Sequence, residues 1–198
     1  MSSLAPRYFP LRHRLFRALW LVTWALLAVW TPPPLHAWRC LLLRLFGAKV
    51  GPNVRVYGTA RIWYPPNLTL EDGAVLGWRS IVYCQAPIRL GRNAVVSQYA
   101  HLISGSHSLD APNMPLVLEP IEIGDEAWVC AGAMVGPGVT LGTGAVLGAG
   151  AVAFADLAEW SIHIGNPARF LRLRSPATSL LPDAPHESPR PRAHSPHR

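Results

Sequence analysis

His107 is the residue of this 198-residue chain whose type and position best suit catalysis. It lies in the segment ISGSHSLDAP, where a regular repeat of the sequence stops and a longer insertion begins. An imidazole accepts a proton from an alcohol near neutral pH, and acyl transfer to a hydroxyl needs such a base. Asp110, three residues further on, is a candidate to orient the second imidazole nitrogen. The position alone also fits a histidine that is hydrogen-bonded for structural reasons, and this alternative stays open.

The other nucleophilic and metal-binding residue types form no recognisable site. Cys40, Cys84 and Cys130 are far apart, odd in number and in no C-x-x-C spacing, which argues against a disulfide framework and a zinc site and favours a reducing compartment. No cysteine or serine stands with a partner base for a covalent relay. His101 and His107 are six residues apart, and no third ligand is evident. We therefore expect no metal.

The element that must position His107 is a repeat with a period of six. From residue 50 onward, an aliphatic residue recurs every six positions, and a small or branched residue stands four positions after it. The clearest run is Ile123, Val129, Val135, Leu141 and Leu147. Three hexapeptides per turn, with excursions at the corners, predict an all-β fold, a left-handed parallel β-helix of about five triangular coils. His107 then ends the third coil, and residues 108–122 form a loop that returns to the repeat.

Residues 1–49 form a basic and apolar segment that precedes this repeat. Two short helices are expected, over residues 15–30 and 35–46, and the first is about 24 Å long, short of the roughly 30 Å hydrocarbon core of a bilayer. No acidic residue occurs before Glu71. The helices either pack on the main domain or a neighbouring subunit, or lie in the membrane interface as a basic, tryptophan-rich anchor. Leu35-His36-Ala37 is a poor signal-peptide cleavage site.

The remaining segments complete the predicted organisation. The β-helix covers residues 50–165, a short capping helix is expected within 166–174, and the Pro-, Ser-, Arg- and His-rich tail 175–198 is expected to be disordered. The net charge of +7 would suit nucleic acid. Only one of the 18 basic residues is a lysine, however, and no basic run alternates with stacking aromatic residues. Nucleic acid is therefore not an expected partner.

Several stretches together resemble a known family. ISGSHSLDAPNMPL, then PIEIGDEAWVCAGAMVGPGVTLGTGAVLGAGAV, then IGNPARFL resemble the hexapeptide-repeat sugar O-acetyltransferases in order and spacing. WTPPPLHAWRCLLLRLFGAKVG followed by ARIWYPPNL is similar to the colanic-acid-type exopolysaccharide biosynthesis acetyltransferases. The resemblance spans roughly residues 12–174.

This resemblance implies an activity and a set of site residues. It implies acetyl-CoA as donor, a sugar or glycan hydroxyl as acceptor, and a homotrimer with each active site between two prisms. His107 matches the catalytic histidine of the family, and Trp128 matches a tryptophan beside it. Ala131 and Ala149 match positions whose backbone binds the pantetheine arm. Arg169 and Arg172 match positions near the nucleotide phosphates, a role that suits guanidinium.

The sequence also departs from this family. Some maltose- and galactoside-type relatives use Asn and Asp to bind the acceptor, and this chain has Gly77 and Gln85 at those positions. Where those relatives have a lysine near CoA, this chain has Ala155. A zinc hydro-lyase similar to γ-carbonic anhydrases and a non-catalytic β-helix scaffold are the alternatives. The expected location is the cytoplasm, and peripheral contact with the inner face of the membrane is one of the partner hypotheses.

Overall fold

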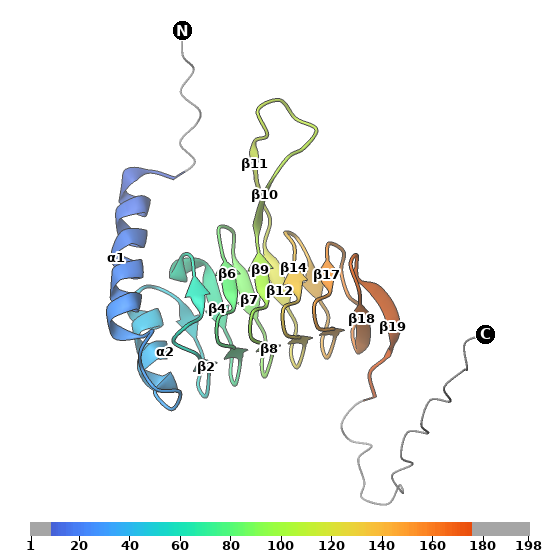
Figure 1. Cartoon of the computed structure of the whole chain (residues 1–198), viewed down its shortest axis with the longest axis horizontal. Helices are drawn as coiled ribbons and strands as arrows, with labels where there is room; N and C mark the ends of the chain where they lie inside the picture. The colour runs from blue at the N-terminus through green and yellow to red at the C-terminus, as the bar shows by residue number, and fades with distance from the viewer. Residues whose placement is uncertain (1–8, 176–198) are drawn as a thin grey trace, which may run out of the picture.

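The computed structural model describes residues 9–175, which form a triangular parallel β-helix with two α-helices at its N-terminal end (Figure 1). The predicted disordered tail therefore lies outside the described residues, except for Ser175. Three sheets make the three sides of the prism. Sheet A contains β1 (Lys49–Val50), β4 (Leu68–Leu70), β7 (Ile88–Leu90), β12 (Ile121–Ile123) and β15 (Thr140–Leu141). Sheet B contains β2 (Arg55–Val56), β5 (Val75–Leu76), β8 (Val95–Val96), β13 (Trp128–Val129), β16 (Val146–Leu147), β18 (Ser161–Ile164) and β19 (Arg169–Leu173). Sheet C contains β3 (Arg61–Ile62), β6 (Ile81–Tyr83), β9 (His101–Ile103), β14 (Met134–Val135) and β17 (Val152–Ala153).

The core consists of the aliphatic residues of the six-residue repeat. On sheet A, Leu70 pairs in register with Leu90, Leu90 with Ile123, and Ile123 with Leu141. All four side chains are buried inside the prism. Each apolar residue thus stacks on its equivalents in the coils before and after it, so that burial is continuous along the axis. The predicted β-helix is confirmed.

The number of coils is about six, one more than the repeat indicated. The last coil is formed by a bridge between Leu141 and Leu157 and by β18, which pairs with β16. Leu157 and Ser161 supply buried positions there, where the spacing of aliphatic residues and glycines is irregular. The six-residue repeat is therefore no longer recognisable in the sequence of the last coil.

The capping helix expected within residues 166–174 is wrong. Residues Arg169–Leu173 form β19, which folds back and pairs antiparallel with β18 at the C-terminal edge of sheet B. An unpaired edge strand leaves a row of backbone N–H and C=O groups without partners, and β19 pairs with those of β18. A short run of mixed apolar and basic residues does not distinguish helix from strand by its periodicity.

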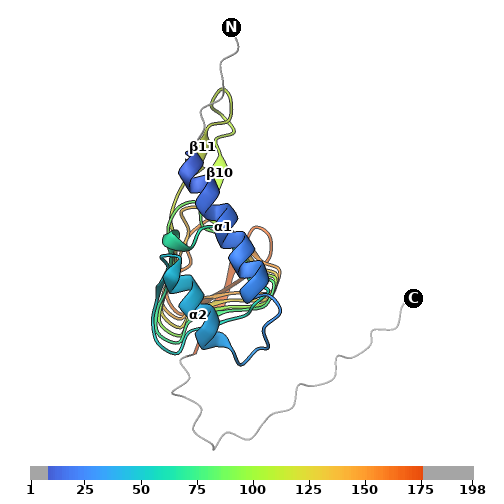
Figure 2. The ribbon, with the colours of Figure 1, turned by 90° about the vertical axis from the view of Figure 1, so that its left-hand side faces the viewer.

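Two helices cover the first coil, as two views at right angles show (Figure 1 and Figure 2). α1 (Leu11–Leu27) and α2 (His36–Leu45) precede β1. The buried Trp20 donates its indole N–H to the Ile62 carbonyl oxygen at 2.7 Å, and Trp24 donates to Gly58 at 3.0 Å. Packing of these helices on the main domain is confirmed. Within residues 9–175, neither helix combines the length and hydropathy needed to cross a bilayer.

The predicted excursion after the third coil is a β-hairpin that projects from the prism (Figure 1). β10 (Gly105–His107) pairs antiparallel with β11 (Leu116–Leu118), and His107 faces Leu116 in the ladder. The chain therefore leaves the prism at Gly105, two residues before the predicted point. His107 lies on a paired strand that leaves the solenoid, and the loop of residues 108–115 follows it.

Candidate active site

The His107 side chain is exposed, and its hydrogen bond fixes how it can act. Nδ1 lies 2.7 Å from the backbone carbonyl oxygen of Met114. A carbonyl oxygen only accepts hydrogen bonds, so Nδ1 must carry the proton of the neutral imidazole. The lone pair is then on Nε2. This arrangement suits a general base, because a carbonyl both selects the tautomer and holds the ring in place.

The turn of the hairpin directs the Met114 carbonyl toward the imidazole. Asn113 and Met114 have φ values of 65° and 43°, in the left-handed region that side chains other than glycine rarely adopt. Ser108 donates its backbone N–H to the Pro115 carbonyl oxygen at 3.0 Å and closes the turn. The proposed role of Asp110 is therefore wrong, since a backbone group orients His107. Such a contact has no residue-type signal in the sequence.

Trp128 lies on a different side of the prism from the root of the hairpin. It lies on β13 of sheet B, is 44% exposed, and donates its indole N–H to the Ser97 hydroxyl at 2.8 Å. The hairpin follows β9 of sheet C. Among residues 9–175, no hydrogen bond or ring contact joins Trp128 to His107. A single chain does not bring these two predicted site residues into contact.

Ala131 and Ala149 do lie together, at the corner between sheets B and C in successive coils. Gly150 donates its backbone N–H to the Ala131 carbonyl oxygen at 2.9 Å, which places the two corners in register. Gly132 and Gly150 have φ values of 66° and 67°, and a Cβ at either position would meet no atom within 4 Å. The corner is thus a strip of small residues open to the outside, where a ligand can approach the backbone closely.

Arg169 and Arg172 lie on β19 at the C-terminal end of this strip. Arg169 faces Ile164, just before the last corner between sheets B and C, and Arg172 faces Ile162. Both side chains are exposed. Their only hydrogen bonds within residues 9–175 go to neighbouring backbone carbonyls, and neither forms a salt bridge there. These guanidinium groups therefore remain available for an anion.

Sequence reasoning missed Ser97, the hydrogen-bond partner of Trp128. Trp128 pairs in register with Val95, and residues two apart on a strand face the same side of a sheet. Ser97 is consequently a diagonal neighbour of Trp128 on the outer face of sheet B. Aligning the hexapeptide repeats coil by coil would have identified this pair.

The cysteine thiols are poorly suited to nucleophilic catalysis. Burial raises the pKa of the Cys84 thiol to about 11. Burial also raises the pKa of Cys40 and of Cys130. The thiolate is the reactive form, so these shifts disfavour a covalent relay through cysteine. Residues 9–175 contain no group of three or more His, Cys, Asp or Glu side chains able to hold a metal ion.

Two family models match the chain. The bacterial transferase hexapeptide (six repeats) matches residues 120–153, and the hexapeptide repeat of succinyl-transferase matches residues 67–97. An Escherichia coli K12 protein, named for a colanic acid biosynthesis acetyltransferase (WcaF), is 39% identical over 156 residues, which cover 79% of this chain and 86% of the relative. A Dictyostelium discoideum protein, named as an acetyltransferase, is 36% identical over 132 residues, 65% of this chain and 69% of that protein.

Solved structures agree with this relationship at the level of the fold. A maltose O-acetyltransferase from Clostridium difficile superposes with a TM-score of 0.73 at 24% identity, covering 82% of this chain and 88% of that chain. A hexapeptide-repeat acetyltransferase from Vibrio cholerae, complexed with acetyl coenzyme A, gives 0.75 at 21% identity and covers 89% and 94%. The 39% identity to the Escherichia coli protein, over 79% of this chain, establishes the family. The chain belongs to the hexapeptide-repeat acetyltransferases, on the branch of the colanic-acid-type enzymes.

Proposed function

We propose that this protein transfers the acetyl group of acetyl-CoA to a hydroxyl of an exopolysaccharide or lipid-linked glycan precursor. The observation that carries the proposal is the hydrogen bond from His107 Nδ1 to the Met114 carbonyl, which leaves Nε2 as the base. Nε2 takes the proton of the sugar hydroxyl while the oxygen attacks the thioester carbonyl. The C–S bond then breaks, the proton passes to the leaving sulfur, and CoA and the O-acetyl ester are the products.

Acetyl-CoA is proposed to lie along the open corner formed by Ala131 and Ala149, with its phosphates toward Arg169 and Arg172. The small side chains allow the pantetheine arm to approach backbone N–H and C=O groups. The two guanidinium groups have no carboxylate partner in the described part of the chain. The name of the solved Vibrio cholerae relative records an acetyl coenzyme A complex, which supports this donor.

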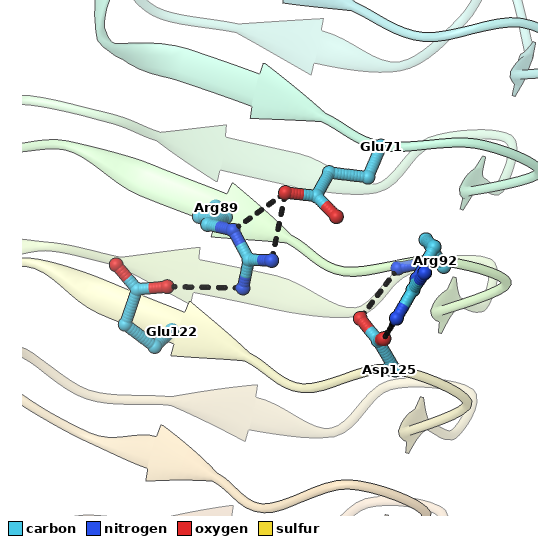
Figure 3. A network of polar contacts seen from close by, with 5 residues as sticks. All are labelled: Glu71, Arg89, Arg92, Glu122 and Asp125. Atoms are coloured by element: carbon cyan, nitrogen blue, oxygen red, sulfur yellow. Dashed lines mark hydrogen bonds and ion pairs between the residues drawn. The ribbon is translucent and has the colours of Figure 1, made fainter.

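We infer that the complete site forms between subunits of a homotrimer, because the proposed site residues lie on different sides of one prism. The outer face of sheet A is polar: Arg89 bridges Glu71 at 2.7 Å and Glu122 at 3.6 Å, and Arg92 pairs with Asp125 at the adjoining corner (Figure 3). Apolar side chains lie on the outer face of sheet B, at Val75 and Val95, and on the later coils of sheet C, at Met134 and Val152. These two faces are the better candidates for subunit contacts, which would bring Trp128 of one chain beside His107 of the next.

The cytoplasmic face of the membrane is the proposed place of action. α1 exposes a stripe of apolar side chains on the side away from Trp20 and Trp24. The stripe consists of Leu15, Leu19, Val22 and Leu26, between 57% and 63% exposed. Arg12 and Arg14 are exposed near it, and basic groups favour anionic lipid surfaces. The cysteines are free, which suits a reducing compartment.

Product analysis tests the proposed reaction. Purified protein is incubated with acetyl-CoA and an undecorated exopolysaccharide oligosaccharide, with thiol release and product mass as readouts. A mass increase of one acetyl group on the saccharide, with CoA formed in equal amount, is expected. Thiol release with no acetylated saccharide for any acceptor tested would contradict the proposal.

A further inference from the structure

A hollow with a volume of about 1030 Å³ lies between α1 and the outer face of sheet C. Its apolar walls include Trp20 and Trp24 of α1 and Trp63 and Tyr83, which follow or end strands of sheet C. His101, the first residue of β9, also lines it. Because β9 runs into β10, the sheet that floors this groove leads directly to the hairpin that carries His107.

The charged side chains of the groove are cationic. Arg61 and Arg79 line it, and no Asp or Glu is among the lining residues. Neither arginine forms a salt bridge within residues 9–175, whereas the arginines of sheet A are paired with carboxylates. Beside the groove, the guanidinium of Arg17 lies 3.9 Å from the centre of the Trp63 ring. The groove thus combines aromatic surfaces with uncompensated positive charge.

The corner that contributes Arg79 and Tyr99 to the groove has residues that its backbone conformation disfavours. Equivalent positions of this corner have positive φ in successive coils: Arg79 (55°), Tyr99 (58°), Gly132 (66°) and Gly150 (67°). Glycine is the residue that adopts this conformation without penalty, and the later coils use it. Arginine and tyrosine carry a conformational cost there that the glycines of the later coils avoid.

The side chains at this corner hold each other in a fixed arrangement. Arg79 donates a guanidinium N–H to the Tyr99 hydroxyl at 3.2 Å, and its guanidinium carbon lies 5.5 Å from the Trp78 ring centre. The Trp78 and Tyr99 rings meet edge to face with centroids 4.8 Å apart. Trp78 and Tyr99 are 41% and 43% exposed. A guanidinium held by a hydroxyl and lying within cation–π distance of two aromatic rings presents its remaining N–H groups to an anion with little loss of side-chain freedom.

We propose that this groove binds the acceptor glycan as an anionic saccharide, with its acidic group at Arg79 and Arg61 and its sugar rings on the aromatic walls. The proposal rests on the proposed acetyl transfer and adds the substrate class. An acceptor held there extends along sheet C toward His107. The acidic group is a uronate carboxylate or a phosphate ester, which share the same guanidinium chemistry.

Calorimetric titration of the full-length protein distinguishes these sources. The probes are an oligoglucuronate, a neutral gluco-oligosaccharide of equal length, and the 1-phosphate of a disaccharide whose sugar units carry no charge. We expect at least one anionic probe to bind ten-fold or more tightly than the neutral one, with affinity that falls as salt rises. Preference for the oligoglucuronate assigns the group as a carboxylate, and preference for the sugar phosphate assigns it as a phosphate. Equal binding of all three probes would overturn the proposal.

Matched arginine variants locate the binding site. Arg79→Gln is expected to lose at least ten-fold in affinity for the preferred anionic probe, while Arg55→Gln, an exposed arginine of β2 outside the groove, keeps it. Unchanged affinity in Arg79→Gln would refute the idea. A change in the mass of the assembly in this variant would refute it as well, because the groove would then be a subunit contact. CoA titrated into the same samples separates the two proposals. If the wild-type protein does not bind CoA, this argues against acetyl transfer, independently of the affinities measured for the saccharides.

Discussion

At the scale of single residues, the proposed chemistry depends on one imidazole and the carbonyl that orients it. The sequence identifies His107 because a histidine at the root of an excursion is conspicuous in a regular repeat. It does not identify Met114, because the contact uses a backbone carbonyl that two left-handed residues turn inward. Backbone partners carry no residue-type signal, so this half of the site required the structure.

Replacing His107 tests its role as the base. His107→Ala is expected to lower turnover by about 10² to 10⁴, the usual contribution of general-base catalysis, with CoA affinity nearly unchanged. His107→Asn should be as inactive, although its amide N–H can still donate to the Met114 carbonyl and support the hairpin. Steady-state thiol release and CoA titration provide the measurements. Near-normal turnover in the Asn variant would show that the histidine is structural.

The buried thiols give a second residue-scale prediction. With a pKa of about 11, Cys84 is ionised at pH 8 to only about one part in a thousand, so alkylation there should be slow. Iodoacetamide at pH 8 should therefore leave acetyl transfer largely intact, as direct attack requires. Peptide mass spectrometry reports the labelled sites. Rapid inactivation that follows labelling of the buried Cys84 would favour a covalent acyl-enzyme.

At the scale of the elements, the hexapeptide repeat predicts what each strand buries but not where the solenoid ends. Val56, Leu76, Val96, Val129 and Leu147 stack in register on sheet B as their spacing requires. The sixth coil escaped prediction because its buried positions are irregular. β19 was not predicted because it forms by pairing with the open edge of sheet B, a tertiary contact that overrides local propensity.

The corner between sheets A and B offers a stability test at this scale. Glu126 has φ 57°, and the equivalent residue of the next coil is Gly144, with φ 67°. Glu126→Gly should stabilise the fold by about 1 kcal/mol, because glycine adopts this conformation without strain. The matched Gly144→Ala should destabilise it, since the added Cβ would lie 2.5 Å from the Trp160 ring. Thermal unfolding should shift by roughly 2–4 °C upward for the first variant.

At the scale of the whole molecule, the prism has one end closed by helices and three sides of unequal polarity. The helices bury Trp20 and Leu43 against the first coil, so removing them would expose the core. Their outer surface, in contrast, is free for another partner. The polar side with its arginine–carboxylate pairs suits water, whereas the outer face of sheet B and the later coils of sheet C suit protein contacts.

Vesicle binding tests the outer surface of α1. Full-length protein should sediment with anionic vesicles and be released by salt, because basic groups contribute about 1 kcal/mol each at such a surface. The double variant Leu19→Gln/Leu26→Gln should lose most of this binding, while Leu109→Gln, an exposed leucine of the hairpin turn, should keep it. Equal sedimentation of all three proteins would exclude a lipid-binding role for the stripe.

Assembly is the prediction on which the complete site depends. Light scattering should give a mass of about 65 kDa, three times the 21.7 kDa of one chain. Val95→Glu places a charge on the outer face of sheet B next to Trp128, where a subunit contact would bury it without a partner. We expect this variant to dissociate and to lose activity, because Trp128 of one chain would no longer lie beside His107 of another. Thr69→Glu makes the matched change on the polar outer face of sheet A and should leave both mass and turnover unchanged. A monomeric Val95→Glu protein with full turnover would mean that one chain contains the entire active site, and the subunit-contact argument would fail.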